Sequence, residues 1–347
     1  MQKGGLCVST LYVAEQLLRA EGFTDIGYIE APINAADVGK VTRGEADIGP
    51  LYASQCVQAI DAGERMTLLA GVMVGCFELF AGNSVRTVAD LKGKSVGIQA
   101  LGSNPHILLT LIAAEVGLDP EKDIRWVTDP KVKPMDRFID GKIDAFLGFP
   151  PEPQQLRAAH VGHVLVNTAV DRPWSQYFCC MLGGFPDYVR AYPNATRSVL
   201  RAFLKAADIC DTDPAGVAQR LADRGRVPRA DYAAQTLADN NYKWREFDPE
   251  DTIRWYALRL RETGLIKSTP KQIIADGTDW RFLNELKREL KVAGPSMLGV
   301  GCPDRHALPH ITRSKHIDPD SCSLPRERVR CVPGMLNSSE VKVLYPT

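Results

Sequence analysis

Apolar residues recur along the first half of the chain in alternating helix-like and strand-like patterns. Residues 12–21 place Val13, Leu17 and Leu18 on one helix face, and Gly22 is a typical stop. A nearly continuous apolar run, Met66–Val74, is typical of a strand in a parallel sheet that is covered on both faces. Strands that alternate with helices predict doubly wound α/β sheets with right-handed crossovers. We expect further helices at 37–43, 54–62, 106–116, 134–139 and 152–159, and strands at 26–29, 46–49, 95–98, 124–127, 143–147 and 163–167.

The pattern changes in the second half of the chain. Residues 168–180 are rich in aromatic and apolar side chains, and we expect them to form an extended segment that crosses back between two lobes. The chain beyond Pro186 is then mainly helical, and Asp248 followed by Pro249 is a strong helix start because Asp caps and proline suits the first position. We expect helices at 193–210, 214–224, 231–240, 249–263 and 279–291.

Two stretches of the chain repeat one another about a hundred residues apart. Asp25 corresponds to Asp123, an offset of 98, and the turn Gly44–Asp47 corresponds to Gly141–Asp144, an offset of 97. Two copies of this size predict two similar α/β lobes with a crevice between them, rather than a solenoid. We expect lobe 1 to comprise residues 1–80 and 175–293, lobe 2 residues 84–168, and residues 294–347 to form an irregular C-terminal tail. Two chain crossings between the lobes would then form a hinge.

Composition excludes several classes of protein. The 347 residues are 45% hydrophobic and 24% charged, which is ordinary for a globular protein with two cores. Lys and Arg number 42, as do Asp and Glu, so no overall charge favours nucleic acid as a partner. No run approaches the roughly 20 apolar residues of a membrane span, and we expect no direct membrane insertion. Nine cysteines do not make a dense disulfide framework.

Several motifs, in the same order along the chain, resemble those of a known group of transport proteins. They are G-E-A-D-I (44–48), T-V-A-D-L-K-G-K-S-V-G-I (87–98), G-L-D-P-E-K-D-I (117–124), G-K-I-D-A-F-L-G-F-P-P-E-P (141–153) and R-P-W-S-Q-Y-F-C-C-M (172–181). Over residues 6–291 the chain resembles the substrate-binding proteins of ABC importers for nitrate, taurine, aliphatic sulfonates and thiamine-pyrimidine precursors. The resemblance implies the type II periplasmic-binding-protein fold, which closes on a small-molecule ligand and delivers it to an ABC transporter permease.

The chain departs from this resemblance at its start. Relatives carry an export leader and an initial strand before the position of Cys7, whereas M-Q-K-G-G stands here. A periplasmic location is expected from the family, and the missing leader leaves open a truncated start or a cytoplasmic protein. The alternative function is therefore a cytosolic enzyme, similar to the fungal enzymes that make the thiamine pyrimidine, or a ligand sensor. Those fungal enzymes carry a C-C-C-F-C string, which the sequence Phe178-Cys179-Cys180-Met181 does not match.

Ligand-binding residues are expected in the loops that follow the strands, because ligands of open α/β sheets lie beyond the carboxyl ends of the strands. Ser103 and Asn104 follow strand 95–98 and begin a helix, whose positive end suits a sulfonate, carboxylate or phosphate; capping of its own helix is the alternative role of Ser103. The corresponding positions of lobe 1 are Ser9, Thr10, Tyr12, Tyr52 and Ser54. Those of the second copy in lobe 2 are Phe149, Pro150 and Glu152, with core packing as the alternative for Phe149.

The two crossing segments supply further candidates. Cys76 and Glu78 lie on the outgoing segment, and Trp174 and Gln176 lie on the returning one. Trp174 can present a flat apolar face together with an indole donor. Glu78 in the cleft would disfavour an anionic ligand and favour an amine or aminopyrimidine; its alternative role is to pair with Arg172 or Lys92.

No catalytic group is assembled in the sequence. Asp47 and Asp144 occupy the same place in the two repeats, which favours bonds to turn amides over paired acid–base catalysis. There is no G-x-S-x-G, P-loop or G-x-G-x-x-G motif, so we expect no enzyme activity and no cofactor. The spacing of the tail residues that suit zinc matches no zinc module, and no metal is expected; these residues are Cys302, His306, His310, His316, Cys322 and Cys331.

Overall fold

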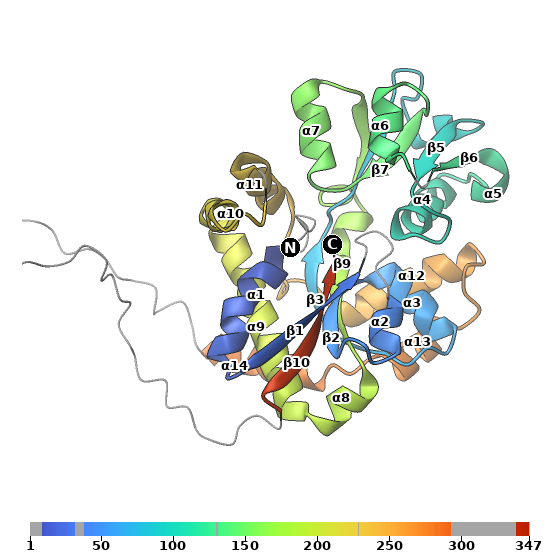
Figure 1. Ribbon diagram of the computed structural model, residues 1–347. Coiled ribbons are helices and arrows are strands. Elements are labelled where there is room, and N and C mark those ends of the chain that lie inside the picture. Colours follow the sequence, from blue (N-terminus) through green and yellow to red (C-terminus); the bar gives the residue numbers. More distant parts are fainter. Residues whose placement is uncertain (1–8, 32–37, 130, 228, 293–337, 347) are drawn as a thin grey trace, which may run out of the picture.

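Two α/β lobes, each built on a five-stranded sheet, make up the computed structural model of the chain (Figure 1). The structure describes residues 9–31, 38–129, 131–227, 229–292 and 338–346. The sheet of the first lobe has the strand order β1-β10-β2-β9-β3, and that of the second has the order β6-β5-β7-β4-β8. This arrangement confirms the predicted fold class.

The first lobe contains both ends of the described chain. Its strands are β1 (Asp25–Ala31), β2 (Ile48–Tyr52), β3 (Thr67–Val74), β9 (Phe178–Gly184) and β10 (Glu340–Pro346). The helices that follow or precede these strands are α1 (Ser9–Ala20), α2 (Val38–Thr42), α3 (Ala53–Asp61) and α8 (Pro186–Ala191). The later helices are α9 (Pro193–Thr212), α10 (Pro214–Asp223), α11 (Ala230–Asp239), α12 (Pro249–Glu262), α13 (Pro270–Gly277) and α14 (Arg281–Val292). Helices α1 and α9 pack against each other, as do α12 and α3.

The second lobe is the smaller one, drawn at the top of Figure 1. Its strands are β4 (Glu78–Ala81), β5 (Ser95–Ile98), β6 (Arg125–Thr128), β7 (Ala145–Gly148) and β8 (His163–Asn167). Its helices are α4 (Asn104–Glu115), α5 (Pro120–Asp123), α6 (Pro134–Ile139) and α7 (Glu152–Ala159). The chain crosses into this lobe between β3 and β4 and returns between β8 and β9, so there are two crossing segments, as predicted.

Strand β10 corrects the prediction of an irregular tail over residues 294–347. It lies between β1 and β2 and is parallel to both; its register with β1 runs from Asp25↔Glu340 to Ala31↔Pro346. Val341, Val343 and Tyr345 are buried on one face of the strand; on the other face Lys342 is exposed and Leu344 is buried. A short, mainly apolar run is consistent with a strand, but the surrounding Pro, Cys and Arg residues obscured it in the sequence. Residues 293–337, including the cysteines and histidines considered for zinc, lie outside the described residues.

The repeat seen in the sequence corresponds to a repeat in the structure. In lobe 2 the Asp144 carboxylate accepts hydrogen bonds from the backbone N–H of Ser95 at 2.8 Å and from its hydroxyl at 2.6 Å. In lobe 1 the Asp47 carboxylate accepts a hydrogen bond from the backbone N–H of Lys342 at 2.6 Å. Asp144 therefore holds the first residue of β5, and Asp47 holds the third residue of β10; each of these strands is the middle one of three parallel strands. The predicted structural role is confirmed, but the bonded amides belong to neighbouring strands and not to turns. Strand β10 occupies in lobe 1 the place that β5 occupies in lobe 2.

Several expectations about the strands were wrong. Strand β3 pairs antiparallel with β9, because the return crossing brings β9 in from the second lobe, and the apolar run at 66–74 carries no information on strand direction. Strand β4, which was not predicted, pairs antiparallel with both β7 and β8. The returning segment is not extended throughout: a cis Arg172–Pro173 bond precedes a short 3₁₀ helix at Trp174–Gln176.

We predict that Val343→Thr lowers the free energy of unfolding by about 1–3 kcal/mol, because a hydroxyl would replace a methyl group at a buried position of the sheet. The matched control Lys342→Thr places the same side chain on the exposed face of β10, and we expect it to change stability by less than about 0.5 kcal/mol. Urea unfolding of the full chain measures both. Equal, small effects at the two positions would contradict the pairing of β10 in the sheet.

Candidate functional site

The carboxyl ends of strands from both lobes face one another at the seam between the lobes. In lobe 1, β2 leads through Tyr52 directly into α3; in lobe 2, β5 leads through Ser103 into α4, and β7 leads through Phe149 into α7. Helices α3 and α4 pack across the seam, as do α11 and α7. The loops around Tyr52, Ser103 and Phe149, three of those predicted to bind a ligand, are thus brought to one place in the fold.

Aromatic side chains connect the two lobes at this seam. The ring of Phe77, on the outgoing crossing, lies 5.6 Å from the ring of Tyr52 in lobe 1 and 6.4 Å from the ring of Phe149 in lobe 2, measured between centroids. Tyr52 and Phe77 are buried, and Phe149 is half-buried. Tilted ring contacts of this kind stabilise packing beyond the area that they bury. The three rings form a continuous apolar wall from one lobe to the other.

Two buried polar side chains also meet across the seam. The Ser54 hydroxyl, at the start of α3, donates a hydrogen bond of 2.6 Å to the Asn104 side-chain oxygen at the start of α4. Ser54 therefore does not cap its own helix through its side chain. Ser103 does not cap α4 through its side chain, because its hydroxyl donates to the backbone oxygen of Ala100 at 2.7 Å. Its expected contact with a ligand stays a prediction.

A buried carboxylate at the hinge is held by an arginine from the second lobe. Glu78, in β4, is only 5% exposed and pairs with the Arg157 guanidinium of α7. The same guanidinium lies 2.7 Å from the Asp239 carboxylate at the end of α11 in lobe 1. Burial raises the pKa of Glu78, although Arg157 opposes this shift. Glu78 was expected to pair with Arg172 or Lys92 if it did not contact a ligand, and this expectation about the partner was wrong.

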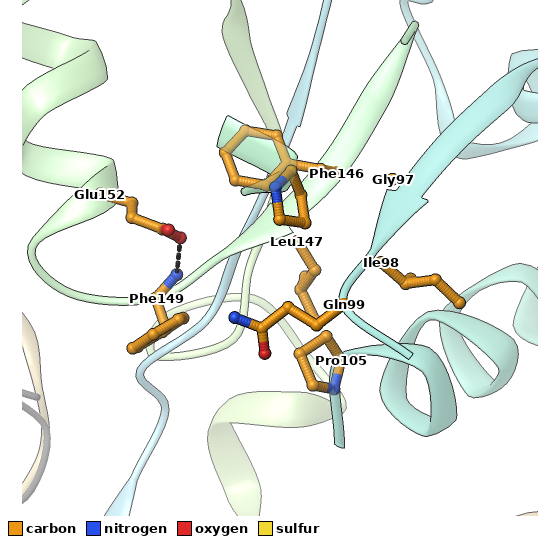
Figure 2. A pocket seen from close by; sticks show the side chains of 9 residues that line it. Gly97, Ile98, Gln99, Pro105, Phe146, Leu147, Phe149 and Glu152 are labelled. Atoms are coloured by element: carbon orange, nitrogen blue, oxygen red, sulfur yellow. Dashed lines mark hydrogen bonds between the residues drawn. The ribbon is translucent and has the colours of Figure 1, made fainter. Parts of the chain in front are cut away.

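A small cavity lies on the lobe 2 side of the seam (Figure 2). Its volume is about 10 Å³, room for about one water molecule. Most of the residues that line it are apolar, and the two with polar side chains are Gln99 and Glu152. The lining residues are Gly97, Ile98, Gln99, Pro105, Pro134, Phe146, Leu147, Phe149 and Glu152.

Glu152 is the ionisable group that faces this cavity. Its carboxylate accepts a hydrogen bond of 3.3 Å from the backbone N–H of Phe149, drawn as a dashed line in Figure 2. Burial raises the pKa of Glu152 to about 7; the Phe149 N–H and Lys133 oppose this shift, and Asp136 adds to it. Near neutral pH the group is therefore divided between a neutral acid, which can donate a hydrogen bond, and a carboxylate, which can only accept one. The Pro150–Pro151 peptide bond that precedes it is cis, and Pro150 is buried.

The other predicted residues lie in two separate surroundings. Ser9, Thr10 and Tyr12 are buried in the first turns of α1, and the Tyr12 ring packs edge-on against Tyr345 of β10 at 5.7 Å. Trp174 is buried with its ring edge-on to Trp255 of α12 at 5.1 Å.

Gln176 is exposed and lines a surface groove of about 530 Å³. This groove is separate from the lobe 2 cavity and has no lining residue in common with it. The structure therefore brings Tyr52, Ser54, Asn104, Phe149 and Glu152 to one seam, with Glu78 at the hinge beside it. It does not bring Trp174 and Gln176 to the cavity.

Sequence reasoning missed Gln99, Arg157 and Asp239. Gln99 follows directly after strand β5, so the rule that selected Ser103 could also have selected it. Arg157 and Asp239 carry no such signal, because their pairing depends on how α7 and α11 pack across the seam. Within the described residues no group of three or more His, Cys, Asp or Glu side chains is arranged to hold a metal ion. None of the helices in the described part of the chain is long and apolar enough to cross a membrane.

Comparisons with known proteins identify a family and several relatives. A model of the NMT1-like family matches residues 18–224, more than half of the chain. The bicarbonate-binding protein CmpA of a Synechococcus species is 30% identical over 95 residues, which are 27% of this chain and 21% of that protein. The chain spans about a fifth of the length of the curated relatives that it matches.

Solved structures share the fold at low sequence identity. The periplasmic nitrate-binding protein NrtA from Synechocystis PCC 6803 superposes with a TM-score of 0.70 at 16% identity, covering 83% of this chain and 87% of that one. The alkanesulfonate-binding protein SsuA from Xanthomonas axonopodis pv. citri, bound to MOPS, gives a TM-score of 0.64 at 22% identity, covering 79% and 96%. The desulfurization enzyme DSZB has the same fold with a TM-score of 0.54 at 18% identity, covering 81% and 96%. The fold alone therefore does not distinguish binding from catalysis.

We predict that Arg157→Gln lowers the free energy of unfolding by about 1–3 kcal/mol, because Glu78 would remain buried without its cationic partner. Asp239→Asn removes the more exposed half of the same bridge, and we expect a loss below about 1 kcal/mol. Chemical unfolding at low and high salt compares the two variants. A larger loss for Asp239→Asn than for Arg157→Gln would contradict the role assigned to Glu78.

A second prediction concerns pH. The pKa of Glu152 is raised from 4.5 to about 7 in the folded chain, so the fold favours the protonated form. The stability that this preference contributes is fully present below about pH 4.5 and is lost as pH rises to about 7. Relative to Glu152→Gln, the wild-type chain should therefore lose stability between pH 5 and pH 8 in chemical unfolding. A difference between the two chains that does not change with pH would contradict the raised pKa.

Proposed function

The chain belongs to the NMT1-like family, and on this premise we propose that it is the solute-binding component of an ABC importer. In this proposal a small solute binds at the seam between the lobes and holds them together, and an ABC transporter permease then receives it. The solute is of sulfonate, nitrate, carboxylate or pyrimidine type. The observation that carries the proposal is the convergence of strand ends from both lobes on one seam, with Phe149 and Glu152 beside a cavity.

The mechanism that we propose is closure about the two crossing segments. The seam contacts, namely the Ser54–Asn104 hydrogen bond and the Arg157–Asp239 ion pair, join lobe 1 to lobe 2 and are lost when the lobes separate. The cavity of about 10 Å³ is lined by lobe 2 residues alone and is too small for the proposed solutes. In this proposal the solute therefore binds beside the cavity, in space that opens when the lobes separate. A solute favours closure because only the closed form lets both lobes contact it.

We propose binding rather than catalysis because, among the described residues, the seam offers recognition groups but no paired nucleophile and base. Glu152 has a pKa near 7, as a general base requires, but its one hydrogen-bond partner in the structure is the Phe149 backbone N–H. The aromatic wall of Tyr52, Phe77 and Phe149 suits a flat or apolar part of a solute, and Gln99 and Glu152 suit a polar head group. A periplasmic location, expected for this family, belongs to the same proposal.

A thermal-shift screen of the full chain with sulfonates, nitrate, carboxylates and aminopyrimidines tests the proposal. A solute at 100 times its dissociation constant should add about 2.7 kcal/mol of stability. Phe149→Ala should weaken the solute at least tenfold, whereas Phe185→Ala, which truncates another half-buried phenylalanine far from the seam, should leave its affinity unchanged. If no solute of these four classes raises the melting temperature of the folded chain, the proposed function is wrong.

A further inference from the structure

Three thiols gather where both crossing segments reach the first lobe. Cys76 lies between β3 and β4, and Cys179 and Cys180 lie at the start of β9. The Sγ atoms of Cys76 and Cys179 are 3.4 Å apart, and the Cys180 thiol interacts with both neighbours. All three side chains are at most 8% exposed. A disulfide has an S–S length of about 2.05 Å, so an approach of about 1.4 Å would bond the closest pair.

The backbone at Cys76 is held in an unusual conformation. Its φ is 114°, in the region that favours glycine, and Gly75 before it has φ 84°. A Cβ added at Gly75 would lie 2.6 Å from the Cα of Ala169, so the outgoing segment packs tightly against the returning one. A residue with a side chain at such a φ costs free energy, and such strain gathers at functional sites. A cysteine, Cys76, thus stands at a hinge position whose backbone conformation glycine would adopt without strain.

We propose that Cys76 and Cys179 form a reversible disulfide that ties the outgoing crossing to the returning one and slows separation of the lobes. The two bonded residues lie on the two segments about which the lobes would move. Phe77, next to Cys76, also carries the aromatic contacts to Tyr52 and Phe149. A covalent bond at this place therefore restrains both the hinge and the wall of the seam. This inference does not depend on which solute binds.

Cys179 is the better partner of Cys76 because their Sγ atoms lie 3.4 Å apart and Cys179 is near the start of β9, where the returning segment enters lobe 1. Cys180 stands opposite Tyr52 on one side and Met73 on the other, inside the sheet. Its hydrogen bond with Cys179 and its burial raise the pKa of the Cys180 thiol well above its usual range. A thiol that stays protonated is a poor nucleophile.

The oxidation needs a two-electron acceptor, for which a peroxide is the simplest class. One thiolate attacks a peroxide oxygen, the O–O bond breaks, and a sulfenic acid forms as hydroxide leaves. The second thiol then attacks the sulfenic sulfur; the S–O bond breaks, water leaves, and the S–S bond forms. Two thiols and one hydrogen peroxide thus give one disulfide and two waters. A dithiol such as dithiothreitol reverses the reaction by thiol–disulfide exchange.

Hydrogen peroxide treatment of the full chain, followed by alkylation and peptide mass spectrometry, tests the assignment. We expect a Cys76–Cys179 cross-link, about 2 Da lighter than the two free thiols, that dithiothreitol removes. Cys180→Ser should keep the link, and Cys179→Ser should lose it. Cys76→Gly should lose it as well, and glycine is suited to the φ at this position, so loss of the link would not reflect unfolding. A Cys76–Cys180 link, or no link involving Cys76, would overturn the proposal.

Hydrogen exchange gives the second readout, because a restrained hinge opens less often. Oxidised chain should exchange the backbone amides of residues 74–80 at least about tenfold more slowly than reduced chain, and dithiothreitol should restore the original rate. Cys179→Ser treated with the same peroxide should show no slowing. A cross-link that leaves these exchange rates unchanged would overturn the restraint of the hinge.

Discussion

Two aspartates at equivalent places hold the central parallel strand of each lobe, and the rest of the fold is arranged around these strands. Asp144 binds the backbone amide that begins β5, and Asp47 binds the amide of Lys342 in β10. Because the amides of a buried strand need hydrogen-bond partners, a carboxylate bound in the first half of the strand helps to fix its position and its register. With β5 and β10 fixed, the strands beside them end at one seam. The loops after these strands carry the residues that we propose bind the solute.

Lobe 1 obtains its central strand from the far end of the described chain. This strand, β10, lies between β1 and β2 and pairs with both. Without β10, β1 would have no partner strand in the described sheet. Leu344 packs closely on Gly49 of β2, where an added Cβ would lie only 2.4 Å from the Leu344 Cβ. Leu344 thus occupies the space that a side chain at position 49 would need, so β10 and β2 are complementary in shape. The seam therefore depends on residues that are distant in sequence but adjacent in the sheet.

The sequence was sufficient for the fold class and for the local elements with strong periodicity or caps. The start of the helix at Pro249 was predicted to the residue because Asp248 caps it, and the aspartates of the repeat had their expected structural role. It was not sufficient for pairings set by packing between distant elements. Strand β10 and the Arg157–Asp239 ion pair depend on such packing, and the local sequence around them is not sufficient to predict either. Trp174 illustrates the same limit, because its buried ring packs in a T-shaped contact with Trp255; its role in ligand binding stays a prediction.

The central claim is that two lobes close on a small solute at their seam. Small-angle X-ray scattering on the full chain, without and with the solute that most raises its melting temperature, measures this closure directly. We expect the radius of gyration to fall when the solute is added and the scattering then to agree with the arrangement of the lobes in Figure 1. A radius of gyration that stays the same while the solute is bound would contradict closure about the hinge.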